Sequence, residues 1–246
     1  RDVVFFGKIR SKNDETTPAF IKCFNMNNLT EMNEIIREVD IYMTLFKDKQ
    51  NFFCKILAYY FDNLNSSFYL FYQYYKRKVL DMVINLDLTT KVNNNISASS
   101  EEESSSGEPT LVHMNAKLNI FKQLIEFLVL IHTKGTIHRD LSLTYFYYDE
   151  KKKTIKTFDL ANAFAIKNEV FDNAEKIDEE LIRIIKQHLY YDGMFFTPKY
   201  TPPELSSENP FFGYGEDIWS FGCMMIEFFL DYSKFTENNI NYLISR

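Results

Sequence analysis

Two acidic residues near the middle of the chain, Asp140 and Asp159, most strongly limit what this sequence can fold into. Asp140 ends the tripeptide His-Arg-Asp, and two short β-prone runs, 145–148 and 154–158, separate it from Asp159. The polar residues 149–153 between the runs predict a turn, so the two runs predict a β-hairpin. We therefore expect the two carboxylates at the two ends of one hairpin.

A helix is expected directly before the hairpin, over residues 115–134, and Gly135 is expected to end it. Two carboxylates brought together on such a framework suit one task, in which one positions a hydroxyl nucleophile and the other holds a metal ion on a phosphate. The alternative for Asp140 is a helix cap or a loop carboxylate. The apolar residues of the helix recur at three- and four-residue steps and predict one buried face, made of Leu118, Phe121, Leu124, Ile125, Leu128 and Ile131.

Composition excludes several other classes of protein. The chain has 246 residues, of which 46% are hydrophobic, enough for a large core in one domain or two lobes. The net charge of -6 argues against a general nucleic-acid-binding or anionic-membrane surface. A cytoplasmic protein is expected, because there is no signal pattern and no bilayer-spanning apolar run, and the three cysteines lack metal-ligand spacing.

The order and spacing of these motifs resemble the catalytic loop and the metal-binding motif of the eukaryotic protein kinases. The resemblance implies an α+β, two-lobed kinase-like fold, with a small β-rich N-lobe that contains one helix and a larger helical C-lobe. The N-lobe is expected over 1–75, with an incomplete first strand and a helix at about 31–46, and the C-lobe over 76–246. The C-lobe is expected to contain a disordered, polar insertion at about 89–114 and the activation segment, 159–204.

The N-lobe sheet is expected to have about five strands. Four β-prone runs predict most of it, at 3–9, 18–24, 52–57 and 68–75.

The resemblance also implies catalytic roles. Asp140 is expected to position the substrate hydroxyl, with Arg139 beside it in the catalytic loop, and Asp159 is expected to hold Mg²⁺. Lys22 ends the segment Ala-Phe-Ile-Lys, which matches the Val-Ala-Ile-Lys of the family, so it is expected to hold the α- and β-phosphates of ATP. Glu38 stands where the family has the glutamate that pairs with this lysine. The alternative for Glu38 is a solvated side chain on an amphipathic helix.

An ATP site is implied between the first strands and the hinge that follows 68–75. Gly7 fits best as the third glycine of the phosphate loop, but Asp2 and Val4 replace the first two, so Gly7 has the alternative of an ordinary strand glycine. Tyr72 is expected near the gatekeeper position. The residues implied in ATP binding are Gly7, Ile9, Ala19, Lys22, Gln73, Tyr75 and Tyr147.

The catalytic loop departs from the family pattern. Ser142 replaces a lysine that contacts phosphate, and Tyr145 replaces the asparagine that helps to hold the second Mg²⁺. A tyrosine cannot replace a carboxamide oxygen at that reach. Tyr147 stands where the family has a leucine beneath adenine, and Phe158 is also large, so the nucleotide pocket is expected to lose a metal ligand and volume.

Two functions therefore remain open. The first is a protein kinase that uses ATP and Mg²⁺ to transfer the γ-phosphate to a protein Ser or Thr hydroxyl. The alternative is a catalytically inactive pseudokinase that acts as a binding or allosteric module. In either case the expected partner is a protein substrate or a regulated protein, and neither a nucleic acid nor a membrane.

The most specific motif lies near the end of the chain, where residues 217–222 match the Asp-x-Trp-Ser-x-Gly helix of the family. The resemblance implies that Asp217 accepts hydrogen bonds from the backbone of the catalytic loop. The family continues through further helices that are missing here, so the chain looks like a fragment of a longer protein.

Overall fold

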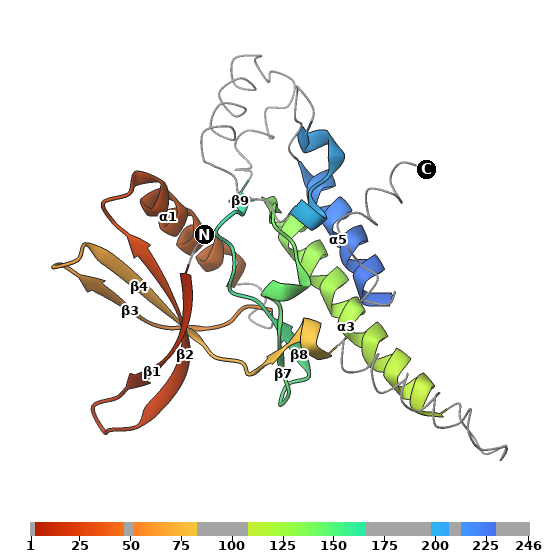
Figure 1. Cartoon of the computed structure of the whole chain (residues 1–246), viewed down its shortest axis with the longest axis horizontal. Coiled ribbons are helices and arrows are strands. Elements are labelled where there is room, and N and C mark those ends of the chain that lie inside the picture. Colours follow the sequence, from red (N-terminus) through yellow and green to blue (C-terminus); the bar gives the residue numbers. More distant parts are fainter. Residues whose placement is uncertain (1–2, 47–51, 83–107, 166–197, 207–212, 230–246) are drawn as a thin grey trace.

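The protein combines antiparallel sheets with helices, so its fold is α+β (Figure 1). The larger sheet and α1 (Leu29–Phe46) form a β-rich N-lobe, and the two long helices α3 (Glu108–Thr133) and α5 (Tyr214–Phe229) lie side by side in the helical C-lobe (Figure 1). None of the described helices is long and apolar enough to cross a membrane. The computed structural model describes residues 3–46, 52–82, 108–165, 198–206 and 213–229.

The N-lobe sheet has four strands, one fewer than expected, in the order β1-β2-β4-β3. Each neighbouring pair is antiparallel. The strands run over Val3–Arg10 (β1), Thr16–Asn25 (β2), Ile56–Asp62 (β3) and Ser67–Gln73 (β4). Three of the four predicted runs are therefore strands with shifted ends.

The fourth run, 52–57, was predicted to be a strand, and this is wrong for its first four residues. The ring centroids of Phe52 and Phe53 lie 6.0 and 5.9 Å from that of Phe127 in α3. Phe53 also pairs with Thr157 through an isolated parallel bridge. The segment packs the N-lobe onto the C-lobe, and the ladder of β3 begins only at Ile56.

Helix α1 begins two residues earlier than expected, because Asn28 caps it. The side-chain oxygen of Asn28 accepts a hydrogen bond from the backbone N–H of Thr30 at 3.0 Å, which satisfies one of the free N–H groups of the first turn. Glu38 is the one charged residue among the buried residues of α1, which are Ile35, Glu38, Ile41, Tyr42 and Leu45. The fold must therefore supply partners for the carboxylate of Glu38.

The hairpin predicted in the C-lobe is present, with β7 (Tyr147–Asp149) paired to β8 (Thr154–Lys156), but its strands have other ends than expected: residues 145–146 precede β7, and residues 157–158 follow β8. β5 (Arg77–Lys78) adds to the edge of β7, and β6 (Thr136–Ile137) pairs with β9 (Phe164–Ala165). The described residues also contain a helical turn at 79–82 and three short 3₁₀ helices, which are η1 (Leu143–Tyr145), η4 (Pro198–Tyr200) and η5 (Pro203–Ser206).

Helix α3 begins at Glu108, so the predicted insertion at 89–114 is wrong for its last seven residues, which are helical. The rest of the expected insertion, up to 107, lies outside the described residues, as do residues 166–197 of the expected activation segment.

The predicted buried face of α3 is only partly right. Leu124, Leu128 and Ile131 are buried, whereas Leu118 and Ile125 are 48% and 41% exposed. The helix packs on two sides, which one apolar stripe does not predict. Phe127 meets the N-lobe segment and the ring of Phe146, while Phe121 stacks on Phe221 of α5, with centroids 5.3 and 5.1 Å apart.

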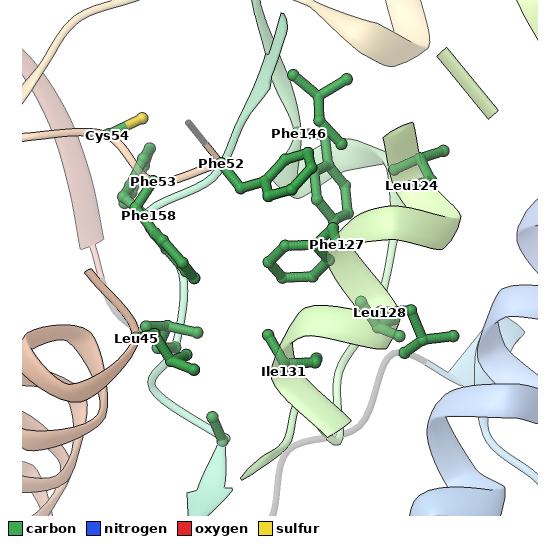
Figure 2. Packing of buried hydrophobic residues seen from close by; sticks show 14 of the residues in the cluster. Leu45, Phe52, Phe53, Cys54, Leu124, Phe127, Leu128, Ile131, Phe146 and Phe158 are labelled. Carbon is green, nitrogen blue, oxygen red and sulfur yellow. The ribbon is translucent and has the colours of Figure 1, made fainter. Parts of the chain in front are cut away.

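The core of the molecule runs between the lobes. Figure 2 shows side chains from α1, from the segment before β3 and from α3 that converge on one apolar cluster. Phe158 of the C-lobe hairpin belongs to the same cluster and is 4% exposed. Because Phe158 directly precedes Asp159, this core fixes the position of one of the two predicted carboxylates.

Candidate functional site

An ion-pair network lies at the junction of the lobes. Lys22 of β2 and Glu38 of α1 are fully buried, and Lys22 Nζ donates to both oxygens of Glu38 at 2.8 and 3.0 Å. Lys22 Nζ also donates to Asp159 Oδ1 at 3.1 Å. Since residues of alternate parity face opposite sides of a strand, Lys22 lies on the buried face of β2 with Phe20 and Phe24. The sequence order thus correctly predicts that Lys22 and Glu38 face each other.

Tyr72 of β4 is a second partner of Glu38, which sequence reasoning missed. Its hydroxyl donates to Glu38 Oε1 at 2.6 Å, and its side chain is fully buried. The β2–β4 register places Tyr72 opposite Phe20, and its hydroxyl reaches helix α1 from the sheet. Only the expected position near the gatekeeper pointed to this residue, and nothing local in the sequence indicated its hydrogen bond.

Burial and charge shift the two carboxylates in opposite directions. Burial raises the pKa of Glu38 to about 7, although the charge of Lys22 and the hydrogen bonds from Lys22 and Tyr72 act against it. Burial also acts to raise the pKa of Asp159, but the charge and hydrogen bond of Lys22, together with His138 and the Ala161 N–H, outweigh it. The pKa of Asp159 is therefore lowered, and Asp159 is the anionic partner of Lys22.

The catalytic-loop carboxylate of Asp140 already accepts hydrogen bonds from within the chain. The Tyr145 hydroxyl donates to Asp140 Oδ2 at 3.0 Å, and the side-chain amide of Asn162 donates to the same oxygen at 3.3 Å. Tyr145 ends η1, which Ser142 caps through its side-chain oxygen. The contact from Asn162 was not predicted, since no spacing rule connects it with Asp140.

Asp217, at the start of α5, holds the catalytic loop as the sequence motif predicts. Its two oxygens accept from the backbone N–H groups of His138 and Arg139, both at 2.8 Å, and its Oδ2 lies 2.8 Å from His132 Nε2. Arg139 has a φ of 68°, a conformation that costs about 1–3 kcal/mol for a residue with a side chain. The buried carboxylate of Asp217 stabilises this backbone directly.

Three of the expected ATP-binding residues form one row across the sheet, because Gly7 pairs with Ala19 and Ala19 pairs with Gln73. Ile9 lies further along β1, opposite Thr17. The Gln73 N–H already donates to the Lys55 carbonyl at 2.8 Å.

Gly7 has a packing role within this row. A Cβ at this position would lie 2.5 Å from Ile21 Cδ1, so the glycine leaves room for that side chain. Tyr75 is half-buried after β4, and Tyr147 packs against Phe20 of the N-lobe sheet.

The profile of the protein kinase domain family matches residues 6–245, almost the whole chain. This chain belongs to the protein kinase family. It is 31% identical over 121 residues to cyclin-dependent kinase 12 of Caenorhabditis elegans, a match that covers 49% of the chain and 14% of that relative. It is 27% identical over 131 residues to CBL-interacting protein kinase 17 of Oryza sativa subsp. japonica, which covers 52% of the chain and 24% of the relative.

A probable casein kinase II subunit alpha homolog of Encephalitozoon cuniculi is 29% identical over 106 residues, which is 43% of the chain and 27% of the relative. The matched parts therefore span less than a third of the length of each of these relatives.

Protein kinases use ATP and Mg²⁺, and the donor set described here fits such a metal ion poorly. The described residues contain no group of three or more His, Cys, Asp and Glu side chains that could hold a metal. Asp159 Oδ1 is engaged by Lys22, and Tyr145 offers a phenol where the family has a carboxamide. Mg²⁺ prefers near-octahedral oxygen ligands and usually one or two carboxylates besides phosphate and water.

Proposed function

We propose that this kinase-family chain works as a pseudokinase, a module that binds or regulates a protein partner without transferring phosphate. The observation that carries the proposal is the hydrogen bond from the Tyr145 hydroxyl to Asp140. In the family this carboxylate meets the hydroxyl of the substrate. Here a hydroxyl of the chain itself occupies one oxygen of Asp140, and the Asn162 amide shares that oxygen.

The same substitution acts on the metal site. Tyr145 replaces a metal-binding asparagine, so Asp159 is the family metal ligand that remains among the described residues. Its Oδ1 is in an ion pair with Lys22. Tyr145 thus replaces a metal ligand and also occupies the position of the substrate hydroxyl at Asp140. Both effects of this one residue support the pseudokinase proposal.

The ion-pair network favours a second candidate, a protein kinase that transfers the γ-phosphate of ATP to a Ser or Thr hydroxyl. Lys22, Glu38 and Asp159 have the charges and the order of the family, and Lys22 Nζ lies within 3.1 Å of both carboxylates. In that function Asp140 positions the substrate hydroxyl, Arg139 supports the catalytic loop, Lys22 holds phosphate and Asp159 holds Mg²⁺. We place this candidate second because buried charges that satisfy one another also serve the fold alone.

We propose a protein as the partner and the cytoplasm as the location. The net charge of -6 argues against a general surface for nucleic acid or anionic lipid. A protein partner also agrees with the kinase family, whose members recognise other proteins.

A phosphotransfer assay decides between the two candidates. The wild type and Asp140→Asn are incubated with radiolabelled ATP and Mg²⁺ or Mn²⁺, and label is measured on the chain itself and on generic protein substrates. We expect the two proteins to give the same background signal. Transfer by the wild type that Asp140→Asn abolishes, while the exposed Asp40→Asn control keeps it, would contradict the pseudokinase proposal.

A further inference from the structure

Three aromatic side chains meet at the junction of the lobes, where the protein kinases have their nucleotide cleft. We call Phe20 of β2, Tyr147 of β7 and Phe158 the aromatic plug. The Phe20 centroid lies 4.5 Å from that of Tyr147 and 5.0 Å from that of Phe158, and the last two lie 5.7 Å apart. Phe20 and Phe158 are buried, at 6% and 4% exposed, and Tyr147 is half-buried.

The plug lies where the family match expects adenine. Phe20 stands at the alanine of Val-Ala-Ile-Lys, two residues before Lys22 on the same strand face, and Tyr147 stands at the leucine beneath the base. A flat base between two groups needs about 7 Å between them, twice a contact distance of about 3.5 Å. The 4.5 Å between Phe20 and Tyr147 leaves no layer for a base.

Further rings hold the plug in place on both sides. Tyr74 packs on Phe20 at 4.9 Å, and Phe6 of β1 packs on Tyr74 at 4.7 Å. On the opposite side Tyr72 stacks on Phe158 at 5.2 Å while its hydroxyl bonds Glu38. Rotation of one plug ring away from the cleft therefore breaks contacts with several neighbours.

The plug also links the lobes to the ion-pair network. Phe20 belongs to the N-lobe sheet, Tyr147 belongs to β7 of the C-lobe hairpin, and Phe158 lies two residues after β8. Lys22 Nζ lies 5.6 Å from the Phe158 ring centroid, close enough for a cation–π contact. The rings thus make, within the chain, the bridge between sheet and hairpin that a stacked base would otherwise make.

We propose that the aromatic plug replaces adenine, so that this protein excludes ATP from the cleft and keeps its lobes joined, with Lys22 and Glu38 paired, without any nucleotide. This goes beyond the proposed function, because it concerns nucleotide binding and the joining of the lobes and not phosphate transfer. A wild type that binds ATP yet transfers no phosphate would overturn this inference and leave the proposed function intact.

The test is a thermal-shift titration with ATP, with and without Mg²⁺, on the wild type and on Phe20→Ala/Tyr147→Leu, which opens the cleft. We expect no shift of the wild-type melting temperature at millimolar ATP. We expect the double variant to melt at a lower temperature without ligand and to be stabilised by ATP, with at least tenfold tighter binding. Tyr147→Leu alone, which restores the family residue and removes less packing, is used if the double variant does not fold.

The control is Phe53→Leu, which removes packing from a fully buried ring that touches Tyr42 and Phe127 outside the plug. This variant is expected to lower the melting temperature with no gain of ATP binding. An ATP-dependent shift in the wild type overturns the proposal. So does an opened variant that folds and still ignores ATP, since some other feature then excludes the nucleotide.

Discussion

The ion-pair network and the aromatic plug lie side by side and differ in how closely they follow the family. In the network Lys22, Glu38 and Asp159 are the family residues, and they contact one another as the family order implies. In the plug the small residues of the family are replaced by rings that touch. Phe20 and Lys22 lie two residues apart on the same face of β2, yet Lys22 is the family residue at its position and Phe20 is a replacement.

This comparison shows that the presence of the family's charged residues does not by itself indicate that the protein still binds the family's ligand. Lys22 and Glu38 are fully buried and satisfy each other, with Tyr72 and Asp159 as further partners. Removing one member of a buried ion pair leaves an uncompensated charge, which is costly whether or not a nucleotide ever binds. The stability of the fold is therefore enough to explain the presence of the ion-pair network, even where the aromatic plug fills the space beside it.

The largest expected effect comes from breaking the network. In Lys22→Met the carboxylates of Glu38 and Asp159 lose their cation in a buried site, so we expect the free energy of unfolding to fall by about 3–5 kcal/mol. Urea denaturation of the nucleotide-free protein measures this change in the free energy of unfolding. The double variant Lys22→Met/Glu38→Leu should recover part of the loss, and a Lys22→Met protein as stable as the wild type would show that the network is not structural.

Tyr72 contacts both the ion-pair network and the aromatic plug, and Tyr72→Phe removes only its contact with the network. The substitution keeps the ring that stacks on Phe158 and removes the hydroxyl that bonds Glu38. We expect a loss of about 1.5–3 kcal/mol, the usual range for a hydrogen bond to a charged group. The comparison variant is Tyr42→Phe, because the Tyr42 hydroxyl donates to the Cys54 carbonyl and accepts from the Ile56 N–H, two neutral groups whose bonds should contribute about 1 kcal/mol each. A loss in Tyr72→Phe no larger than that of one such neutral bond would mean that Tyr72 contributes nothing specific to the network.

The pH dependence of stability isolates the charge of Glu38. Its pKa is about 7 in the folded protein and 4.5 as the model-compound value, so the folded state holds more protons between these values. The stability that Glu38 contributes is therefore fully present below about pH 4.5 and is lost as the pH rises to about 7. The difference in unfolding free energy between the wild type and Glu38→Gln should fall across this window, by at most about 1.4 kcal/mol per pH unit. A difference for Glu38→Gln that does not change with pH across this window would contradict the shift.

The smallest effect concerns the metal and needs an open cleft to be seen. Tyr145→Asn restores a carboxamide oxygen at the family position and removes the phenol from Asp140. Added to Phe20→Ala/Tyr147→Leu, it should raise ATP affinity severalfold in Mg²⁺ and leave the affinity without Mg²⁺ unchanged. Tyr145→Phe, which removes only the hydroxyl, is the control and should give no such Mg²⁺-dependent gain. The same gain from both variants would mean that the carboxamide is not the cause.

The sequence predicted the parts of the site that short motifs determine. Local patterns in a known order predict three features that the structure contains. These are the hairpin, the Lys22–Glu38 ion pair and the hydrogen bonds between Asp217 and the backbone of the catalytic loop. The contacts of Tyr72 with Glu38 and of Asn162 with Asp140 could not be predicted. They depend on which side chains the tertiary packing brings together across 34 and 22 residues of chain.

The same limit applies to the fold. One apolar stripe was expected on α3, but the helix packs against the N-lobe segment and against α5, so its contacts spread over two faces. Periodicity reports only that a helix has a buried side and does not say how many neighbours share it. The strand prediction at 52–57 failed for a related reason, since aromatic residues suit a strand and an interlobe contact equally well.

The hold of Asp217 on the catalytic loop has a consequence for the order of events during synthesis. The carboxylate reaches backbone N–H groups that lie 79 and 78 residues earlier in the chain. A growing polypeptide therefore exposes His138 and Arg139 well before the side chain that fixes them has been made, and the left-handed backbone of Arg139 has no such support until then. We therefore expect the catalytic loop to take its final shape only after α5 has been synthesised, well after the residues of the loop itself.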